Sequence, residues 1–406
     1  MNSSLKKIKI IYLKYTLNPK YVYKSCQDCI VILEKIDITE TNEKRVLVTD
    51  KNELDEILTT VVIKNDRATF RGNNFRVVKI FEKMNPRIVR DKIENSFYSH
   101  SKIIYEVGKI VYVNSFNEDL NSFGGEGIYY YKSIAPAFYF ELIKFHPRYT
   151  GKIYYWDDNG YLYFEGNYLE GMKHGEFKVF KVNRRLLIIQ NYKLNIRVGQ
   201  WINYFHNENI KSIRNYENGV LHGLFLQYHC AGTIHKMFNY NKGKINGKYI
   251  ENYLDGKKHI EINFVNGIKH GESLSWYPNS NIKTKCTYVN GLLYGIYECW
   301  YENGNMCLRK EFMNGMLNGK ETHWYPTGMM KYKHYYTCNK EYKTWTGWYH
   351  NGTTKYNIEH NIKDDNKKTI KFWTENANLI KTSNYKVELG NNILDQILLD
   401  DFSSNN

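Results

Sequence analysis

One glycine recurs every 24 residues from Gly151 to Gly319, and this period restricts the fold more than any other feature. The boundary glycines are Gly151, Gly175, Gly199, Gly223, Gly247, Gly271, Gly295 and Gly319. The fifth position after them holds Trp156, Phe180, Tyr204, Tyr228, Trp276, Trp300, Trp324 and Trp348, with Asn252 as the exception. The seventeenth position holds Tyr168, Tyr192, Tyr216, Tyr240, Phe264, Tyr288, Phe312 and Tyr336. A period of about 20 to 50 residues is the signature of stacked repeat units.

Each repeat is interpreted as a strand, a turn, a second strand and a second turn, which leaves too few residues for a crossover helix. In the unit that starts at Gly295, residues 296–301 are expected to form a strand, Glu302-Asn303-Gly304-Asn305 a turn, and residues 306–312 the return strand. Asn-Gly tolerates the positive φ of a tight hairpin turn. A parallel crossover needs about a dozen residues or more. Consecutive units are therefore expected to continue as an antiparallel meander.

The identical phase of the repeats places equivalent side chains of neighbouring hairpins next to one another. We therefore expect aromatic ladders, which supply the burial that a lone hairpin lacks. With strands about 4.8 Å apart and about ten units, the array is expected to be an elongated single layer. The ladder residues are the candidate interaction residues of the chain: Trp276, Trp300, Trp324, Trp348, Tyr288, Phe312 and Tyr336.

The repeat resembles the MORN family, and most closely its variant with a tyrosine–asparagine–glycine turn. The residues that carry this resemblance include Tyr216-Glu217-Asn218-Gly219-Val220-Leu221-His222-Gly223 and Trp300-Tyr301-Glu302-Asn303-Gly304. The likeness extends from about Gly151 to Tyr385. It weakens at Asn183-Arg184-Arg185 and after Lys343, as expected of terminal repeats.

Three segments are predicted. Residues 1–146 lack the period and are expected to form a small α+β domain of unknown function. Residues 147–388 hold about ten MORN-type β-hairpin repeats. Residues 389–406 are expected to form a capping helix and a frayed tail, because Ile393, Leu394, Ile397, Leu398 and Phe402 follow helical spacing. The predicted fold class is mainly β, with an elongated single-layer meander preceded by a small α+β domain.

Within the N-terminal segment, strands are expected at residues 8–15, 30–38, 76–81 and 103–113, and helices at 52–58 and 135–142. Three stretches resemble an uncharacterised domain of giant amoeba-infecting viruses: Tyr105-Glu106-Val107-Gly108-Lys109, Phe116-Asn117-Glu118 and Gly127-Ile128-Tyr129-Tyr130-Tyr131. That domain carries no assigned activity. The resemblance implies a viral protein located in the host cytoplasm or in the virion.

The net charge of +15 is compatible with a phosphate-bearing partner, either nucleic acid or an anionic membrane. However, the lysines are spread along the chain together with many Asn, Ile and Tyr, as AT-rich codons would produce, and no specific nucleic-acid signal is present. The N-terminus lacks the apolar segment of a secretory signal, and no run of about 18 apolar residues predicts a transmembrane helix. Seven scattered cysteines fit a reducing, intracellular compartment.

Several short motifs contain residue types that could bind a metal or catalyse a reaction, but each is better explained by a structural role. Cys26-Gln27-Asp28-Cys29 lacks the second ligand pair that zinc needs. One register holds His174, His222 and His270, about 19 Å apart. They are too far apart to share a metal ion, and each is expected to pack or form hydrogen bonds within its own turn. Gly124-Gly125-Glu126-Gly127-Ile128-Tyr129-Tyr130 faintly resembles a strand of ADP-ribosyltransferases, which would require a pocket holding a Glu and a His. No catalytic, cofactor-binding or metal-binding residue is assigned, and no cofactor is expected.

The preferred hypothesis is a non-enzymatic repeat scaffold that mediates protein–protein interaction. Its partner is an unknown protein, and self-association is a further mode to consider. The alternative is peripheral binding of an anionic phospholipid membrane through the repeats, a role often proposed for MORN proteins and motivated here by the net charge. The second alternative is an ADP-ribosyltransferase-like enzyme in the N-terminal domain.

Overall fold

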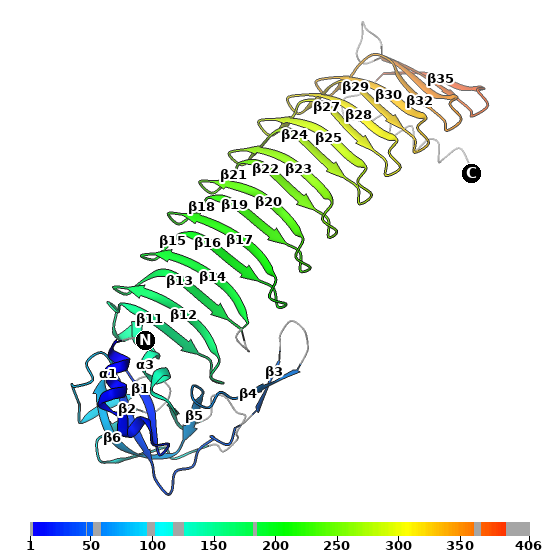
Figure 1. The fold of residues 1–406 in the computed structure, drawn as a ribbon. Coiled ribbons are helices and arrows are strands. Elements are labelled where there is room, and N and C mark those ends of the chain that lie inside the picture. Colours follow the sequence, from blue (N-terminus) through cyan, green and yellow to red (C-terminus); the bar gives the residue numbers. More distant parts are fainter. Residues whose placement is uncertain are drawn as a thin grey trace. The chain divides into compact units, whose positions relative to one another are not determined.

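A computed structural model describes residues 3–45, 47–51, 58–95, 102–116, 126–181, 185–360 and 367–386. The chain is mainly β, with a small α+β part followed by a long antiparallel meander, as the sequence predicts. It divides into two compact units, Met1–Val220 and Leu221–Asn406. The first unit holds the α+β part and the first hairpins of the meander, and the second unit holds the remaining hairpins (Figure 1).

The α+β part is built on a six-stranded antiparallel sheet with the order β5-β10-β1-β2-β6-β9. Its strands are β1 (Tyr21–Cys26), β2 (Cys29–Lys35), β5 (Thr69–Gly72), β6 (Asn74–Glu82), β9 (Ile110–Tyr112) and β10 (Ile128–Tyr131). Two small antiparallel pairs accompany it: β3 (Leu47–Lys51) with β4 (Leu58–Val62), and β7 (Lys92–Asn95) with β8 (Ile103–Glu106). The helices are α1 (Ser3–Ile11), α2 (Leu13–Thr16), α3 (Ile134–Tyr139) and α4 (Leu142–Phe145).

Both faces of this sheet are covered, because alternate residues of β2 enter two different cores. Val31 and Leu33 belong to the core that contains Phe70, Phe75 and Tyr130. Ile30 and Ile32 belong to the second core, which also takes in side chains of α1, of α3 and of the first meander strand, namely Leu5, Ile8, Phe138 and Ile153. The α+β part is thereby packed directly onto the start of the meander.

The N-terminal predictions are only partly confirmed. The strand expected at residues 8–15 is wrong, because Leu5, Ile8 and Tyr12 follow helical spacing and bury one side of α1 and the residue after it. The strands expected at 30–38, 76–81 and 103–113 correspond to β2, β6 and β8 with β9, and the helix expected at 135–142 corresponds to α3 followed by α4. Residues 52–57 of the expected helix at 52–58, and the whole capping helix at 389–406, lie outside the described residues.

The meander strands follow one another in chain order. In the first unit these are β11 (Gly151–Trp156), β12 (Leu162–Leu169), β13 (Met172–Phe180), β14 (Leu186–Lys193), β15 (Ile196–Arg197), β16 (Gly199–Tyr204), β17 (Ile210–Glu217) and β18 (Val220–Leu221). In the second unit they are β19 (Gly223–Tyr228), β20 (Ile234–Asn241), β21 (Lys244–Ile245), β22 (Gly247–Asn252), β23 (Lys258–Val265), β24 (Ile268–Trp276), β25 (Ile282–Val289), β26 (Leu292–Leu293), β27 (Gly295–Trp300), β28 (Met306–Met313), β29 (Met316–Trp324), β30 (Met330–Thr337), β31 (Lys340–Glu341), β32 (Trp345–Trp348), β33 (Thr354–His360), β34 (Lys367–Trp373) and β35 (Leu379–Lys386).

Turn chemistry explains why each hairpin reverses where it does. Asn314 and Gly315 have φ of 52° and 79°, and two successive positive φ values are what a type I′ hairpin turn requires. In the same repeat, the boundary Gly295 pairs with Phe312, and the register then shifts between Cys299 and Trp300. The same bulge recurs at the equivalent place in neighbouring repeats, for example between Ser275 and Trp276. The predicted strand–turn–strand unit is confirmed.

Candidate interaction surface

The four ladder tryptophans are half-buried, and a hydroxyl from the preceding repeat fixes each of them through its backbone. A tyrosine lies six residues after each of Gly247, Gly271, Gly295 and Gly319, and it donates a hydrogen bond to the tryptophan carbonyl oxygen of the next repeat. The oxygen–oxygen distances are 2.7 Å for Tyr253 to Trp276, 2.9 Å for Tyr277 to Trp300, 2.8 Å for Tyr301 to Trp324 and 2.9 Å for Tyr325 to Trp348. Neighbouring repeats are therefore joined by a regular row of hydrogen bonds.

In the second predicted ladder, formed by Tyr288, Phe312 and Tyr336, the rings alternate with side chains from another position of the repeat, which the sequence did not lead us to expect. The ring of Tyr336 contacts Trp345 with centroids 5.2 Å apart, and the ring of Phe312 contacts Tyr297 at 6.3 Å. Tyr288 instead lies beneath the ammonium group of Lys269, at 5.0 Å. The interleaving residues occupy the second position after the boundary glycine: Ile153, Phe177, Trp201, Phe225, Tyr249, Tyr297 and Trp345, with Ser273 and Glu321 as exceptions. Their 24-residue spacing was the signal that could have revealed them.

Glu321 replaces an aromatic residue in this row and brings a polar cluster into the second unit. Its carboxylate is 5% exposed and lies 3.0 Å from Lys310 Nζ and 2.8 Å from His323 Nε2. Burial raises the pKa of Glu321, but the hydrogen bonds from His323 and Lys310 outweigh it, so that the pKa lies below its usual value. Next to it, burial lowers the pKa of His334 to about 4, and the His334 ring stacks on Trp345 at 3.9 Å. This cluster is an ion pair and ring stack inside the array.

The histidine and cysteine motifs have structural roles. His270 Nδ1 accepts a hydrogen bond from the backbone N–H of Asn290 in the turn of the next repeat, whereas the buried His174 Nδ1 has no hydrogen-bond partner among the described residues. Cys26 and Cys29 pair directly across the β1–β2 hairpin, and burial raises their pKa values to about 11 and about 12. Among the described residues, no group of three or more His, Cys, Asp and Glu side chains is gathered to hold a metal ion.

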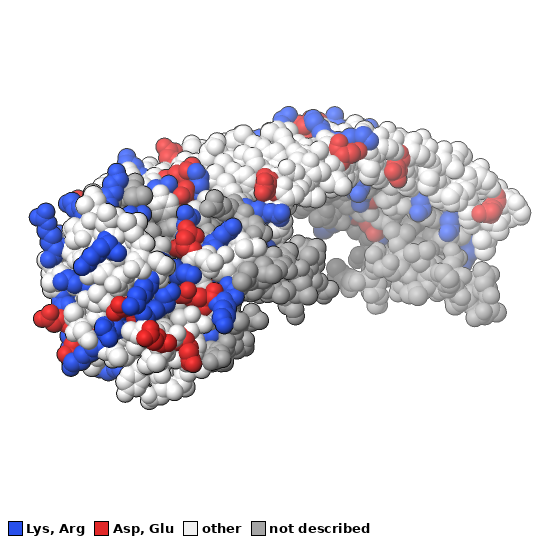
Figure 2. Space-filling view, turned by 60° about the horizontal axis from the view of Figure 1, so that its bottom comes forward, with Lys and Arg blue, Asp and Glu red and all other residues white. Residues whose placement is uncertain are grey.

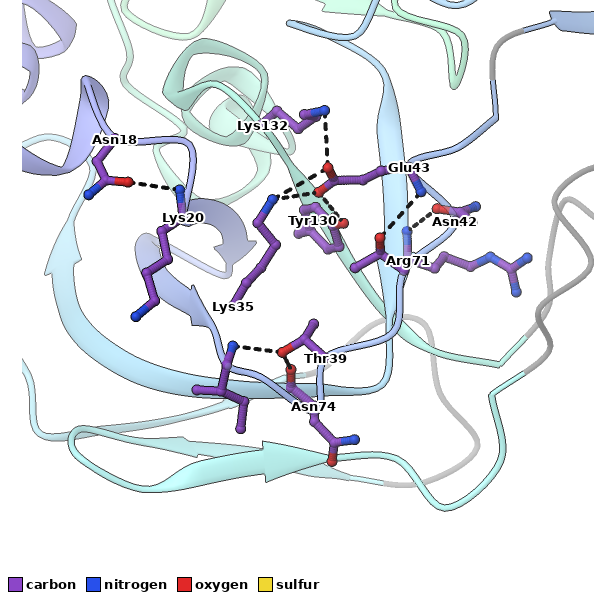
Figure 3. A network of polar contacts seen from close by, with 12 residues as sticks. Asn18, Lys20, Lys35, Thr39, Asn42, Glu43, Arg71, Asn74, Tyr130 and Lys132 are labelled. Atoms are coloured by element: carbon purple, nitrogen blue, oxygen red, sulfur yellow. Dashed lines mark hydrogen bonds and ion pairs between the residues drawn. The ribbon is translucent and has the colours of Figure 1, made fainter.

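Tyr130, from the segment that resembles a transferase strand, belongs to the α+β core. It is fully buried, its ring contacts Phe75 at 5.2 Å, and its hydroxyl donates to Glu43 Oε1 at 2.7 Å. Lys35 and Lys132 also reach the Glu43 carboxylate, at 3.2 Å and 3.1 Å (Figure 3). Burial raises the pKa of Glu43, but the hydrogen bond from Tyr130 and the charges of Lys35 and Lys132 outweigh this effect, so that the pKa lies below its usual value. The network fixes the loop after β2 onto β10.

Two further lysines of the α+β part are buried. Lys83 donates to Ser25 Oγ at 2.7 Å and to the carbonyl oxygen of Phe140 at 2.8 Å. Lys24 donates to the carbonyl oxygen of Tyr129 at 3.1 Å. Burial lowers the pKa of each ammonium group to about 8. Lys83 thereby holds the residue after α3 against the sheet, and Lys24 on β1 adds a side-chain bond to the neighbouring strand β10.

Positive charge is dispersed among the described residues of the repeats. On the face shown in Figure 2, basic and acidic side chains are interspersed. Many lysines of the repeats lie over aromatic rings instead of gathering in a patch, such as Lys283 over Tyr277 at 5.4 Å and Lys331 over Tyr325 at 5.6 Å. Within the described part of the chain, no helix has the length and hydrophobicity to cross a bilayer.

One edge of the second unit carries an exposed apolar row at three successive hairpin corners. We call it the corner ridge, and its members are Val265, Ile268, Val289, Leu292, Met313 and Met316, each between 37% and 52% exposed. At each corner the two residues are direct cross-strand partners. Sequence reasoning missed this ridge, although its residues occupy two fixed registers of the repeat.

The ridge is continuous from corner to corner. A Cβ atom placed on Gly291 would lie 3.3 Å from Ile268 Cγ2, and one on Gly315 would lie 3.3 Å from Leu292 Cδ2. Each of these side chains therefore rests on the turn of the next repeat. The ridge ends at both sides in exposed lysines, because the preceding corner carries Lys242 and Lys244 and the following corner carries Lys340.

Comparisons with known proteins add no family. No family model matches this chain, and no curated protein matches it. Among solved structures, similarity is found to a chain of a structure titled "Crystal Structure of TcdB2-TccC3-Cdc42", with 8% sequence identity and a TM-score of 0.16. The match covers 95% of this chain, which spans 22% of that chain. So low a TM-score carries no argument about fold or function.

Proposed function

We propose that this chain is a non-enzymatic interaction scaffold of the MORN type whose corner ridge binds a protein partner. The observation that supports this is the set of six exposed apolar side chains in one uninterrupted row. Contiguous exposed apolar surface on a soluble protein marks interaction sites, whereas single exposed hydrophobic residues are ordinary. The bonded repeats beneath the ridge hold it in one shape, so that little ordering is needed on binding.

The charges at the ends of the ridge favour a different protein over a second copy of this chain. In a two-fold dimer formed on the ridge, each lysine corner would face a lysine corner of the partner copy, whichever way the two ridges run. The corners with Lys242 and Lys244 or with Lys340 would then repel one another. A partner with acidic groups at these places is complementary.

The tips of the ridge corners favour a protein over an anionic membrane. Each apolar pair flanks an exposed Asn-Gly tip, namely Asn266-Gly267, Asn290-Gly291 and Asn314-Gly315. Insertion of these corners into hydrocarbon would strip water from the asparagine amides and from the turn backbone, which is costly without hydrogen-bond partners. A protein surface supplies such partners. We place this interaction in the host cytoplasm or the virion, as the viral resemblance implies.

The test compares an Ile268→Glu/Leu292→Glu double variant with a matched Leu254→Glu variant. Leu254 is also exposed but lies in the turn between β22 and β23, away from the ridge. A protein captured from host cells and then purified should bind the full-length chain and the Leu254→Glu variant alike. Its affinity for the double variant should fall by about 10-fold or more.

Three outcomes would contradict the proposal. One is a captured protein that binds the double variant as well as the wild type. Another is that the wild type sediments as a dimer and the double variant sediments as a monomer. The third is ridge-dependent sedimentation with phosphatidylserine vesicles that fades as salt is raised.

A further inference from the structure

We infer that the partner presents an amphipathic α-helix that lies along the corner ridge with one heptad for each hairpin and an acidic residue at either end. This inference rests on the proposed function, since it names the kind of protein segment that the same ridge binds. Three independent properties of the ridge lead to it: the spacing of its corners, its side-chain types and the charges at its ends.

The spacing of the corners matches a helix. Each repeat adds two strands, and neighbouring strands are about 4.8 Å apart, so successive corners lie about 9.6 Å apart. An α-helix rises about 1.5 Å per residue and returns to nearly the same side after seven residues, or about 10.5 Å. Over the two intervals between the corners at Val265 and Met313, the mismatch accumulates to only about 2 Å.

Other regular conformations fit less well. Side chains on one side of an extended strand recur at about 6.7 Å, which falls out of step with the corners immediately. A polyproline II segment recurs at about 9.3 Å and so matches the spacing, but such segments are bound by grooves lined with aromatic residues. The corner ridge presents valine, isoleucine, leucine and methionine.

The side-chain types also favour the apolar face of a helix. Aliphatic residues line grooves that receive such faces, and methionine adapts its unbranched side chain to varied partners. Met313 and Met316 place two methionines at one corner. Tyr294 and Ile296, which follow Leu292 in the sequence, are also 48% and 43% exposed.

The lysine corners fix the charge and the length of the helix. The corner with Lys242 and Lys244 lies one repeat before the first apolar corner, and the corner with Lys340 lies one repeat after the last. Five corners span about 38 Å, which corresponds to about four heptads of helix. The predicted segment therefore carries Asp or Glu at its first and last heptad positions and apolar residues at the three positions between them.

The test is a selection from a display library of helix-favouring peptides of four heptads and one residue. The positions one heptad apart are randomised, and the target is the full-length chain. We expect apolar residues at the three inner positions and Asp or Glu at both ends. In fluorescence anisotropy, the Kd of the selected peptides should rise at least about 10-fold on the Ile268→Glu/Leu292→Glu variant. It should rise by about three- to tenfold on a Lys242→Glu/Lys244→Glu/Lys340→Glu variant.

A charge exchange provides the control for folding. A peptide with lysine at both ends should bind the lysine-to-glutamate variant better than the wild type, which a misfolded variant could not produce. Selected peptides that depend on the ridge but show no helical circular dichroism when bound, have polar residues at the three inner positions or have no acidic ends would overturn this inference and leave the proposed function standing. Selected peptides whose Kd is the same for the wild type and the Ile268→Glu/Leu292→Glu variant would overturn the inference. The proposed function would be overturned only if the protein captured from host cells also bound that variant as well as the wild type.

Discussion

The α+β part and the meander bury their aromatic residues to different extents. In the α+β part, Phe70, Phe75 and Tyr130 are fully buried, because side chains cover both faces of the sheet. In the meander, Phe177 and Trp345 are buried, but rings such as Trp201 and Tyr216 remain half-buried although their centroids are 5.0 Å apart. A single layer cannot enclose its own faces, so each repeat depends on contacts with its neighbours. A few buried core residues should therefore contribute most of the folding stability of the α+β part, whereas many small contacts between repeats should contribute that of the meander.

Removal of a core ring should produce the largest effect. Phe75→Ala leaves a cavity in a closed core and should destabilise the α+β part by about 3–5 kcal/mol. Tyr216→Ala, the matched change in the meander, should cost less than half as much, since its ring is already half solvated. Hydrogen exchange followed by mass spectrometry measures both losses locally. Equal losses would remove the distinction between the two regions.

Acid should weaken the second unit through His334. Its pKa of about 4 lies below the usual value of 6.5, so the unfolded chain binds more protons between these values and stability falls as pH drops through this range. From pH 6.5 to 4.5 the loss should be about 2 kcal/mol. A His334→Phe variant should lack most of this loss in β30 and β32, as exchange at pH 6.5 and 4.5 would show. An unchanged pH response in that variant would refute the assignment.

Mild alkali should strengthen the α+β part. The pKa of Lys83 is lowered to about 8 by burial, below the usual 10.5, so the unfolded chain binds more protons between these values and stability rises as pH passes 8. Above pH 9 the raised pKa values of Cys26 and Cys29 act in the opposite direction. Between pH 8 and 9 the gain from Lys83 should be about 1 kcal/mol. A Lys83→Met variant should show a flatter profile than the wild type, and identical profiles would count against a buried ammonium.

Loss of one tyrosine hydroxyl should have the smallest effect and the narrowest range. Tyr301→Phe removes the bond to the Trp324 carbonyl oxygen and should cost about 0.5–1.5 kcal/mol. Faster exchange should appear in β27 to β30 and fade within a repeat on either side. Tyr163→Phe, at an exposed tyrosine outside this row, is the control. Faster exchange along the whole second unit would mean that the repeats unfold as one body.

The sequence predicted the meander because its signal is local and repeated. Asn-Gly turns, boundary glycines and aromatic registers are all contained within one 24-residue unit. The topology of the α+β part could not be predicted from the sequence, because β10 pairs with β5 and β1, which are distant from it in the sequence. The helix α1 was missed because the β-branched run from Ile8 to Ile11 hides the helical spacing of Leu5 and Ile8. The corner ridge is harder to recognise in the sequence, because its two registers hold different aliphatic residues at each corner and polar residues in the flanking repeats.

The hydroxyl bond between repeats ends on a backbone oxygen, and this has an evolutionary consequence. A carbonyl is present whatever side chain the recipient position carries, so a donor such as Tyr277 would find the same acceptor on any later repeat in phase. Removal of residues 278–301 would bring the Trp324 carbonyl to the place of the Trp300 carbonyl. Units of 24 residues can thus be gained or lost without change to the flanking sequence, and homologous chains should differ in length by whole multiples of the unit.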